Sequence, residues 1–349
     1  MSGKRTQMST ILDVAREAGV SPSTVTHALN GKRPVGADTK KRILEVIERL
    51  GYVANHSASH LRSGQSKIIG CYVVDITENF ANQIVRGVEK GLVGSGYSLL
   101  FASGVELGGD LQKVLKFFQE YAVDGLLICH HLTFAKGASR LLAESTIPVV
   151  SINKEIEGVC SIVPDNLAGG MQAADHLVSA GMTCPAMLAG PQDRDSSIQR
   201  VIGFRTRLSE LGLAFVDGLC LNGKYDFQHG YDGVSTLLRA EPAINGIFCA
   251  DDYIAAGAIS SLRSMGVQVP GQVRILGFDN RDFSGFWSVP ISTFEQPLQE
   301  MGMMGFGMLK SLIESPSSVL PGCIRLQSRL VARSSTLPHV AHESDYFGA

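Results

Sequence analysis

The sequence predicts two kinds of fold in one chain: a small all-α head, followed by an α/β body with two doubly wound parallel sheets. Two observations lead to this prediction. Residues 10–51 contain three short amphipathic stretches separated by turn residues, and from residue 67 onward short apolar runs alternate with amphipathic stretches. With 349 residues, 44% of them hydrophobic and 18% charged, the chain is long enough for two or three domains with a large core.

The head is expected to contain three helices. Thr10 can cap the first, Gly19 ends it, and its apolar residues follow the i, i+3, i+4, i+7 rule: Ile11, Val14, Ala15 and Ala18. In the second helix we expect Ser21 as the cap, Pro22 at the first position, and Val25 and Leu29 facing inward. The third runs from Gly36 to Leu50, is closed by Gly51, and has Ile43, Val46, Ile47 and Leu50 as its apolar residues. The first two helices and their tight turn have the pattern of a helix-turn-helix.

The charge of the head differs from that of the body. Residues 1–66 carry ten of the 31 Lys and Arg residues and five of the 33 acidic residues, a balance of +5, so the rest of the chain carries −7. A basic segment is typical of polyanion binding. Pro22, Ser23, Thr26 and His27 are not needed in the core, and small polar groups there can contact phosphates and base edges in a DNA major groove. The alternative is a plain three-helix bundle with a solvated face.

The body contains nine apolar runs that we expect to form buried parallel strands joined by crossover helices. They are residues 67–75, 97–103, 124–130, 147–153, 160–165, 184–190, 246–251, 273–279 and 291–296. Ligands of such sheets bind beyond the carboxyl ends of the strands.

Polar and aromatic residues follow several of these runs. They are Asp75, Asn79, Phe80, Asp193, Arg194, Ser196, Tyr225, Asp226, Asp251, Asp252, Asp279 and Asn280. Carboxylates and guanidinium groups bind ligand hydroxyls, and flat rings stack on a sugar or a base. Asp251 and Asp279 could instead be ordinary helix caps, and Trp287 could be a wedge in the wall of the site or a stacking ring.

Other classes of function are disfavoured. The sequence has no P-loop, GxSxG or HExxH motif, and the glycines of residues 91–96 do not follow a strand, so we expect neither an enzyme nor a bound cofactor. The seven cysteines are dispersed without CxxC spacing, which indicates buried free thiols and no metal site. No apolar run approaches the roughly 18 residues of a membrane span, and the N-terminus lacks the apolar stretch of a secretory signal. We therefore expect a cytoplasmic protein without membrane contact.

The run TILDVAREAGVSPSTVTHALNGKRPV, followed by TKKRILEVIERLGYVANHSASHLRSG, resembles the head of the lactose and purine repressor family of bacterial transcription factors. The resemblance continues to about residue 337. It implies that Pro22, Ser23 and His27 read bases and that Ser21, Thr24 and Thr26 bind phosphates. The implied DNA-binding set also includes Asn30, within the head, and Asn55, directly after it. Ala54 and Gly36 depart from the usual Pro and Ser of the family.

Residues 55–63 form a linker with little to bury, so that a helix there is marginal in isolation. In the resembling family this hinge helix folds on the operator and pairs with its twin across a dimer. The resemblance places Ala58 at the contact between the paired helices and makes Leu61 a wedge between base pairs. The alternative is an ordinary flexible linker.

The same resemblance implies a two-lobed effector domain similar to periplasmic sugar-binding proteins, crossed by three connections. Asn79, Phe80, Arg194, Ser196, Tyr225 and Asp279 fall on effector-binding positions. Ile198 departs from the family, since many sugar repressors have an Arg there, and residues 78–81 read Glu-Asn-Phe-Ala in place of Asn-Pro-Phe-Phe. These departures leave the identity of the effector open.

We therefore expect a homodimeric transcriptional regulator that binds operator DNA and a small effector, a sugar or sugar derivative. A nucleobase-responsive, co-repressed regulator is the alternative, and a sugar-binding protein or enzyme on the same fold is disfavoured by the head. The expected domains are residues 1–54 (head), 55–66 (hinge helix and linker), 67–167 with 298–323 (first lobe), 168–297 with 324–337 (second lobe) and 338–349 (flexible tail). The absence of a Leu heptad after residue 337 favours a dimer over a tetramer.

Overall fold

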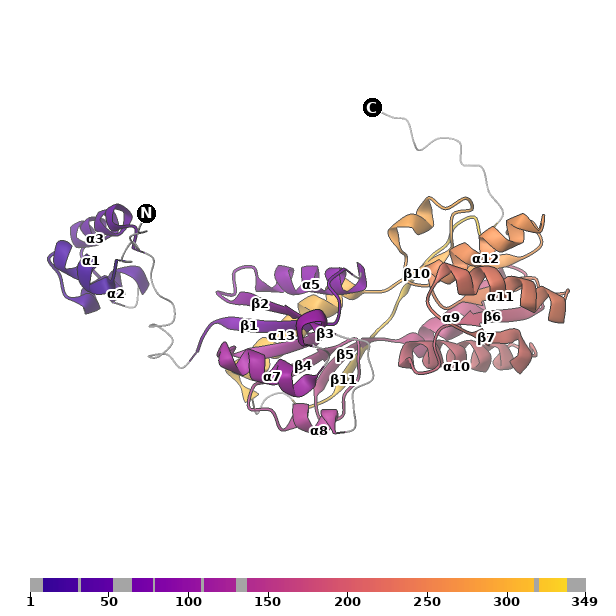
Figure 1. The fold of residues 1–349 in the computed structure, drawn as a ribbon, viewed down its shortest axis with the longest axis horizontal. Helices are drawn as coiled ribbons and strands as arrows, with labels where there is room; N and C mark the ends of the chain where they lie inside the picture. The colour runs from indigo at the N-terminus through magenta and orange to yellow at the C-terminus, as the bar shows by residue number, and fades with distance from the viewer. Residues whose placement is uncertain are drawn as a thin grey trace, which may run out of the picture. The chain divides into compact units, whose positions relative to one another are not determined.

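The computed structural model describes residues 9–30, 33–52, 65–77, 79–107, 110–129, 137–316 and 320–337. The chain divides into two units, Met1–Ser66 and Lys67–Ala349 (Figure 1). The second unit consists of two lobes, each built on its own parallel sheet.

The head unit contains helices α1 (Ile11–Glu17), α2 (Pro22–Asn30) and α3 (Ala37–Leu50). Thr10 caps α1 in a capping box: Asp13 N–H donates to Thr10 Oγ1, and Thr10 N–H donates to Asp13 Oδ2 over 2.9 Å. The backbone N–H of Thr24 donates to Ser21 Oγ over 3.2 Å at the start of α2. Gly51 ends α3 with a φ of 59°, a left-handed conformation that favours glycine. The predicted helix boundaries in the head are thus confirmed.

The head encloses its own small core of seven buried residues: Val14, Ala15, Ala18, Val25, Ala28, Ile43 and Val46. One inward residue was predicted wrongly, because Leu29 is 38% exposed whereas Ala28 is 5% exposed. Positions i+3 and i+4 from Val25 lie on the same helix face, so the sequence pattern could not choose between them. Packing against α1 and α3 turns the smaller residue inward.

The first lobe contains a six-stranded parallel sheet with the order β11-β5-β4-β3-β1-β2. Its strands are β1 (Ile68–Val73), β2 (Ser98–Ser103), β3 (Gly125–Cys129), β4 (Val149–Ile152), β5 (Cys160–Pro164) and β11 (Cys323–Leu326). Alternate residues of β1 face opposite layers: Ile69 and Val73 pack with α5 (Asn79–Leu92) and α13 (Leu298–Glu314). Tyr72 packs with α7 (Leu111–Glu120) and α8 (Ala138–Ala143). Burial on both faces explains the continuous apolar runs.

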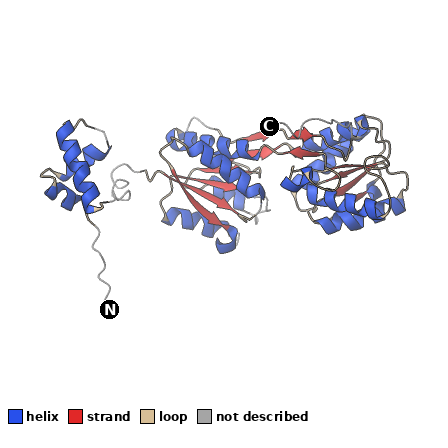
Figure 2. Cartoon of the chain, turned by 90° about the horizontal axis from the view of Figure 1, so that it is seen from above, coloured by secondary structure: helices blue, strands red, loops and turns tan. Residues whose placement is uncertain are grey.

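The second lobe has a four-stranded parallel sheet with the order β7-β6-β8-β9. Its strands are β6 (Pro185–Ala189), β7 (Cys220–Asn222), β8 (Gly246–Cys249) and β9 (Arg274–Leu276). Its helices are α9 (Asn166–Ser179), α10 (Asp195–Glu210), α11 (Phe227–Ala240) and α12 (Asp252–Ser264). Helices α9 and α10 pack together, as do α11 and α12. Figure 2 shows helices on both sides of the strands of each lobe.

The apolar run 291–296 adds no full strand to either parallel sheet, although Ser292 forms an isolated parallel bridge with Leu276 of β9. It forms β10 (Thr293–Glu295), which pairs antiparallel with β12 (Arg329–Val331). Strands β7, β11 and β12 were not predicted, because each has only three or four residues and none of them is fully buried. The chain passes between the lobes after β5, between β10 and α13, and between β11 and β12. The expected domain boundary after residue 323 falls at the first residue of β11, whose strand lies in the first sheet.

Three helix pairs cross at glycines. These are Gly87 with Gly302 between α5 and α13, Gly170 with Gly203 between α9 and α10, and Gly230 with Gly257 between α11 and α12. A Cβ atom at Gly257 would lie 2.0 Å from the carbonyl oxygen of Phe227, and one at Gly230 would lie 2.0 Å from that of Ile254. The two backbones therefore approach so closely that no side chain fits between them.

All seven cysteines are free thiols; Cys71, Cys129, Cys160 and Cys249 are buried, and the other three are half-buried. Within the described ranges, no helix has the length and apolar character needed to cross a membrane. Nor do these ranges contain a group of three or more His, Cys, Asp or Glu side chains that could hold a metal ion.

Candidate DNA-binding and effector sites

The N-terminus of α2 presents a group of hydroxyls. Ser21 Oγ lies 2.7 Å from Ser23 Oγ and 2.8 Å from Thr24 Oγ1, and both serines are exposed, as is Pro22. A helix N-terminus carries a partial positive charge and unpaired N–H groups, so this group can bind phosphate oxygens. His27, one turn further along, is half-buried.

The core of the head fixes which face of α2 is exposed. Val25 and Ala28 pack inward, and Arg42 Nε of α3 donates to the carbonyl oxygen of Ala18 over 3.0 Å. Thr26 Oγ1 donates to the carbonyl oxygen of Pro22 over 2.9 Å. Asn30 is the last residue of α2, and its side chain lies outside the described part of the structure, as do residues Asn55, Ala58 and Leu61.

The first lobe contributes a turn and a ring to the expected effector site. Thr77 donates to Asp75 Oδ1 from its backbone N–H over 2.8 Å and from its hydroxyl over 2.7 Å. These bonds, that of the hydroxyl first, lower the pKa of Asp75. Asn79 begins α5, and Phe80 is half-buried against the core between α5 and the sheet.

The second lobe brings Ser196 and Tyr225 together, with their hydroxyl oxygens 3.2 Å apart. Arg194 stands at the N-cap position of α10, two residues before Ser196. A Cβ atom at Gly190 would lie 2.3 Å from Cζ of Tyr225, so only glycine leaves room for this ring. Burial raises the pKa of Tyr225, whose titration is also influenced by the nearby charges of Arg200 and Asp279. The tyrosine is therefore held as a neutral phenol beside a charged network.

Arg200 is the centre of that network. Its guanidinium donates to Asn166 Oδ1 over 2.9 Å and to the carbonyl oxygen of Ala250 over 2.5 Å. It also lies 3.6 Å from Asp279 Oδ1. Its Cζ atom stands over the ring of Phe278, 3.6 Å from the ring centroid. The residue is 3% exposed. Asp279 has a φ of 103°, which is strained for a residue with a side chain. Such strain is typical of functional sites.

Two adjacent carboxylates in the same region have different environments. Asp252 accepts from Thr293 Oγ1 over 2.6 Å, and from Ser284 Oγ and the backbone N–H of Arg281 over 2.7 Å each. Its oxygens are thereby occupied within the lobe. Burial raises the pKa of Asp252 to about 6.

Asp251 uses one oxygen to cap α12, accepting from the backbone N–H of Ile254 over 2.8 Å. Its other oxygen lies 3.9 Å from Arg281 Nη2, which is also 3.6 Å from Asp279 Oδ2. Burial, followed by the charge of Asp279, raises the pKa of Asp251 to about 7. Arg281 therefore links two of the carboxylates in the expected effector set.

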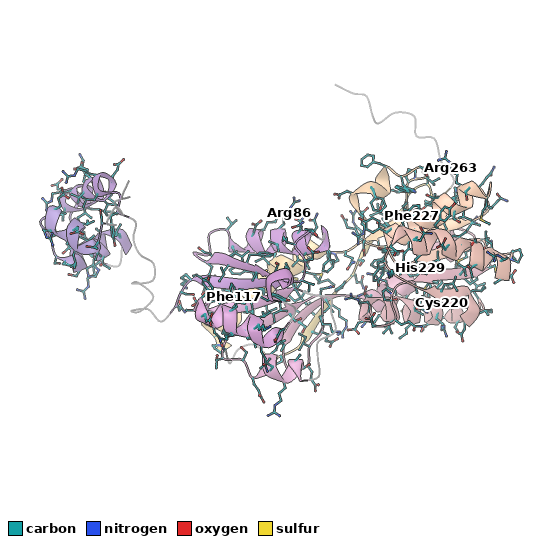
Figure 3. All side chains as sticks on the ribbon, viewed as in Figure 1. Arg86, Phe117, Cys220, Phe227, His229 and Arg263 are labelled. Atoms are coloured by element: carbon teal, nitrogen blue, oxygen red, sulfur yellow. The ribbon has the colours of Figure 1, made fainter. Side chains whose placement is uncertain are left out.

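Trp287 lies among other aromatic side chains. Its ring centroid is 6.2 Å from that of Phe227 and 5.6 Å from that of Phe283. Figure 3 labels Phe227 on α11, together with His229.

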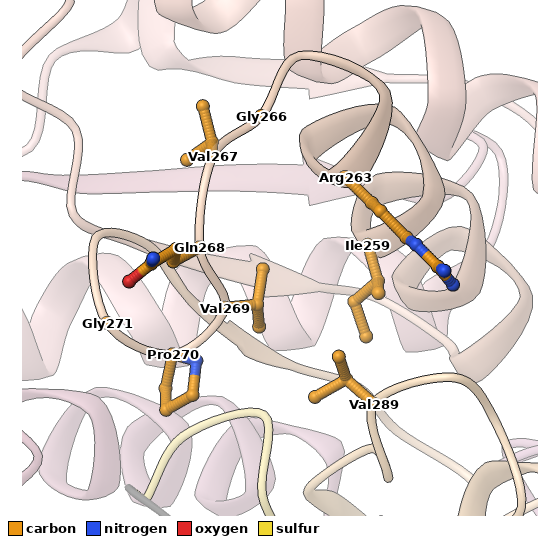
Figure 4. A pocket seen from close by; sticks show the side chains of 9 residues that line it. All are labelled: Ile259, Arg263, Gly266, Val267, Gln268, Val269, Pro270, Gly271 and Val289. Atoms are coloured by element: carbon orange, nitrogen blue, oxygen red, sulfur yellow. The ribbon is translucent and has the colours of Figure 1, made fainter.

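Two cavities of the second lobe are lined by residues outside the expected effector set. One, of about 580 Å³, is shown in Figure 4 and is lined by Ile259, Arg263, Gly266, Val267, Gln268, Val269, Pro270, Gly271 and Val289. Another, of about 520 Å³, includes Ile198, which is 42% exposed on α10. Ile198 departs from the Arg of many sugar repressors, while Arg200, two residues later on α10, lies 3.6 Å from Asp279 Oδ1.

Sequence reasoning missed Arg200, Arg281 and Gln296. The signal for Arg200 was its place on the buried face of α10, where Ser197, Gly203 and Phe204 also lie. A charged residue at a core-facing helix position needs a buried partner. The partners of Arg200 are distant in sequence, so the pattern alone could not identify them.

Residues 10–55 match the model of the lacI family of bacterial regulatory proteins, and residues 174–336 match that of a periplasmic binding protein-like domain. The ribose operon repressor of Escherichia coli K12 is 30% identical over 315 residues, which are 89% of this chain and 94% of that protein. The HTH-type transcriptional repressor PurR of Actinobacillus pleuropneumoniae serotype 3 is 31% identical over 332 residues, 94% of this chain and 98% of that protein.

Solved structures have the same fold. A lac repressor dimer bound to operator and the anti-inducer ONPF matches with a TM-score of 0.83 at 23% identity, over 95% of this chain and all of that one. A complex of the transcriptional regulator CelR with cellobiose matches with a TM-score of 0.68 at 26% identity, over 94% and 99% of the two chains. The resemblance seen in the sequence is thus confirmed. The chain belongs to the lacI family of bacterial regulatory proteins, which are DNA-binding transcriptional repressors and not enzymes.

Proposed function

We propose that this chain acts in the cytoplasm as a homodimer that binds a partly palindromic operator, and that a small metabolite bound by the two-lobed body controls the affinity for DNA. The observation that carries the proposal is the cluster of hydroxyls at the N-terminus of α2, formed by exposed Ser21 and Ser23 and by half-buried Thr24, in a basic unit separate from the body. Hydroxyls and N–H groups at a helix N-terminus position a protein on phosphates.

On the DNA, Pro22, Ser23 and His27 contact base edges, while Ser21, Thr24 and Thr26 bind phosphates. Asn30 and Asn55 extend this contact set along the chain. Ala58 and Leu61 act in the hinge segment, where paired helices insert Leu61 into the minor groove. The balance of +5 in residues 1–66 supplies the sequence-independent part of the affinity.

In the body, a sugar or sugar derivative binds beside the carboxyl ends of the strands. Arg194, Ser196, Tyr225, Asp251 and Asp279 bind its hydroxyls. From the first lobe Asp75, Asn79 and Phe80 complete the site, and Trp287 supports its wall. The choice of a sugar is supported by two similar proteins whose names refer to sugars, the ribose operon repressor and the complex of CelR with cellobiose. A nucleobase is the alternative, because the rings of Phe80 and Tyr225 could enclose a planar ligand.

The second lobe supports dimerisation through an exposed aromatic surface. Phe286 is 93% exposed, Tyr253 is 42% exposed, and Phe227 and Tyr231 are 37% exposed each. Exposed apolar surface of this kind marks a protein contact. The lac repressor structure with which this chain shares its fold is a dimer.

Selection of binding sites from random DNA duplexes by the full-length protein tests the DNA half of the proposal. We expect a partly palindromic consensus, bound by two copies of the chain as counted by light scattering. Enrichment of no sequence, or binding by a single copy, contradicts the proposal.

Calorimetry on Arg194→Ala and Asp279→Ala tests the effector half, using a ligand found by a thermal-shift screen of sugars, sugar phosphates and nucleobases. A ligand that binds only the folded state raises the melting temperature. Both variants should bind the ligand more weakly than the parent. Undiminished binding by both places the effector elsewhere.

A further inference from the structure

The cavity of about 580 Å³ in the second lobe has an apolar floor (Figure 4). Its lining includes Ile259 of α12, then Val267, Val269 and Pro270 of the loop between α12 and β9, and Val289. Ile259 is fully buried, whereas the three valines pack on the edge of the lobe's core and are half-buried. The floor of the cavity is therefore a part of the core that the described residues leave partly uncovered.

A positive charge stands beside this floor. Arg263, near the end of α12, is the charged member of the nine lining residues. It is exposed and forms no ion pair with any residue that the structure describes. The other large cavity of the lobe differs in this respect, because its Arg205 lies 2.7 Å from Asp217 Oδ1. The cavity beside Arg263 thus combines apolar surface with a cation that can bind an anion from outside the described residues.

The last described residues of the chain lie next to this cavity. The backbone N–H of Ser335 donates to the carbonyl oxygen of Pro290 over 3.0 Å, and Pro290 directly follows Val289 of the lining. Ser335 Oγ donates to the carbonyl oxygen of Ile275 over 2.6 Å, and Ser335 is fully buried. The described chain ends at Leu337, two residues later. These bonds fix, beside the cavity, the point at which the chain leaves the described part of the lobe.

Twelve residues follow Leu337, and their composition complements the cavity. They read Pro-His-Val-Ala-His-Glu-Ser-Asp-Tyr-Phe-Gly-Ala, with two acidic residues and no Lys or Arg. The aromatic pair Tyr346 and Phe347 directly follows the acidic residues Glu343 and Asp345. Aromatic rings gain much free energy when they are buried, and a carboxylate pairs well with a guanidinium group. Five consecutive residues therefore carry both groups that the cavity can bind.

The length of this segment is sufficient. Tyr346 is nine residues beyond Leu337, and an extended chain of that length spans about 30 Å. As a flexible linker, the same nine residues have a typical end-to-end distance of about 15–18 Å. Such a short tether keeps the segment at an effective concentration in the millimolar range. A contact that would be weak between separate molecules can therefore persist within one chain.

We propose that residues 343–347 bind in this cavity of their own chain. The two rings cover the valines of the floor, and the carboxylate of Asp345 pairs with the guanidinium of Arg263. The inference goes beyond the proposed function, because it concerns a surface assigned neither to the operator nor to the effector. It gives a fixed place to a segment whose polar composition predicts a flexible tail.

Photo-crosslinking of the full-length protein tests the contact directly. Phe347→p-benzoylphenylalanine should form, on irradiation, a cross-link to residues 259–271 or to Val289, located by mass spectrometry of the digest. A cross-link within one chain keeps the mass of a monomer on a denaturing gel, whereas one between two copies doubles it. The same photoreactive residue in place of Leu320, which is 84% exposed before β11, is the matched control and should not reach the cavity.

Hydrogen exchange of residues 267–273 provides a second measurement. Exchange there should be at least threefold faster in a chain that ends at Leu337 than in the full-length protein, because the cavity is then uncovered. Arg263→Glu should accelerate it as well, and adding Asp345→Lys to that variant should restore the parental rate. Arg239→Glu, at an exposed position in the last turn of α11, is the matched control and should leave the rate unchanged.

Four results would overturn the inference. They are a cross-link from position 347 to another part of the chain, a cross-linked species of doubled mass, equal exchange in the truncated and full-length chains, and no recovery of the parental rate in the charge-swapped variant. A doubled mass would assign the cavity to the segment of a second copy. Operator selection and effector binding are measured separately, so their outcomes bear on the proposed function and not on this contact.

Discussion

At the scale of single residues, Arg200 shows how one side chain can organise a site. Its guanidinium bonds to α9 through Asn166, to the end of β8 through the carbonyl of Ala250, and to the loop after β9 through Asp279. Removing one partner of such a buried network costs about 3–5 kcal/mol, because the remaining charge stays buried. Arg200 therefore connects three elements that meet at the carboxyl ends of the strands of the second sheet.

His27 is predicted to read bases, since it lies one turn beyond the hydroxyl group of α2. His27→Ala should lose discrimination at one or two operator positions, by about 1–3 kcal/mol per base contact. Thr24→Ala, which removes a predicted phosphate contact, should instead weaken binding to all sequences alike. Titration of single-base operator variants separates the two effects, and an unchanged sequence preference in His27→Ala would remove this histidine from the base-reading set.

Asp251 makes the stability of the protein depend on pH. Its pKa in the folded chain is about 7, against an ordinary value of 3.8. Between these pH values the folded chain binds a proton on Asp251 that the unfolded chain does not. The free energy of unfolding therefore decreases as the pH rises from about 4 to about 7. Asp251→Asn cannot ionise, and Asn is an equally good helix cap.

The Asp251→Asn variant should therefore gain about 1–4 kcal/mol relative to the parent between pH 5 and pH 8. Urea unfolding at the two pH values measures this gain. Asp226→Asn, which changes the cap of α11, is the matched control. An equal stability difference between Asp251→Asn and the parent at both pH values would show that the carboxylate is not protonated in the fold.

At the scale of helices and strands, the local signals in the sequence were reliable. Thr10, Gly19, Ser21 and Gly51 marked the ends of helices because capping depends on neighbours in the chain. The pairing of β10 with β12 joins residues more than 30 positions apart, and the choice of Ala28 over Leu29 depends on packing between helices. Arg200 was missed for the same reason: Asn166 and Asp279 become its neighbours only in the folded lobe.

Replacing glycine by alanine should change the stability of the protein in opposite directions at Gly257, where two helices cross, and at Gly307, where no described residue packs close by. Gly257→Ala should cost about 1–3 kcal/mol, since its Cβ would collide with the backbone of α11. Gly307→Ala, in α13, has no heavy atom of the described residues within 4 Å of its Cβ and should gain about 0.5–1 kcal/mol from helix propensity. Melting curves of both variants provide the comparison, and a gain in both would show that α11 and α12 can separate without loss.

The hinge segment makes a separate prediction through Leu61, the wedge implied by the family resemblance. Leu61→Ala keeps helix propensity but removes most of the wedge, so operator binding and bending should weaken while the melting temperature stays nearly unchanged. Gel-shift and bending assays on the selected operator, paired with a melting curve, measure both properties. A core residue would show the reverse, because truncating a buried Leu costs about 2–5 kcal/mol of stability.

At the scale of the whole molecule, control of DNA binding requires that the effector change the arrangement of the lobes. Coupling of about 1–3 kcal/mol would alter operator affinity by roughly 5- to 150-fold, in the direction of induction or of co-repression. Lys154, which follows β4 in the first lobe, forms an ion pair with Asp195 at the start of α10 in the second. This pair joins the two lobes beside Arg194 and Ser196.

Lys154→Met should therefore weaken effector binding by about twofold to tenfold, because it removes an attraction that holds the lobes together around the ligand. The effect should shrink as salt is added. Arg205→Met, which breaks an ion pair with Asp217 inside the second lobe, is the matched control for calorimetry. Equal losses in the two variants would show that the pair between the lobes has no special role.

The order of elements along the chain also determines how the protein can fold during its synthesis. The second lobe is continuous from α9 to β10 and is completed later by β12, which pairs with β10. The first lobe still lacks α13 and the edge strand β11 when β10 has been synthesised. At about 5–20 residues per second, the ribosome produces the roughly 160 residues between β5 and β11 in about 8–30 s. During this interval α5 has no helix to cover Gly87, and β5 has an open edge. The head can fold as soon as it leaves the ribosome, so a nascent chain acquires its DNA-binding unit well before it has a complete body with which to sense a metabolite.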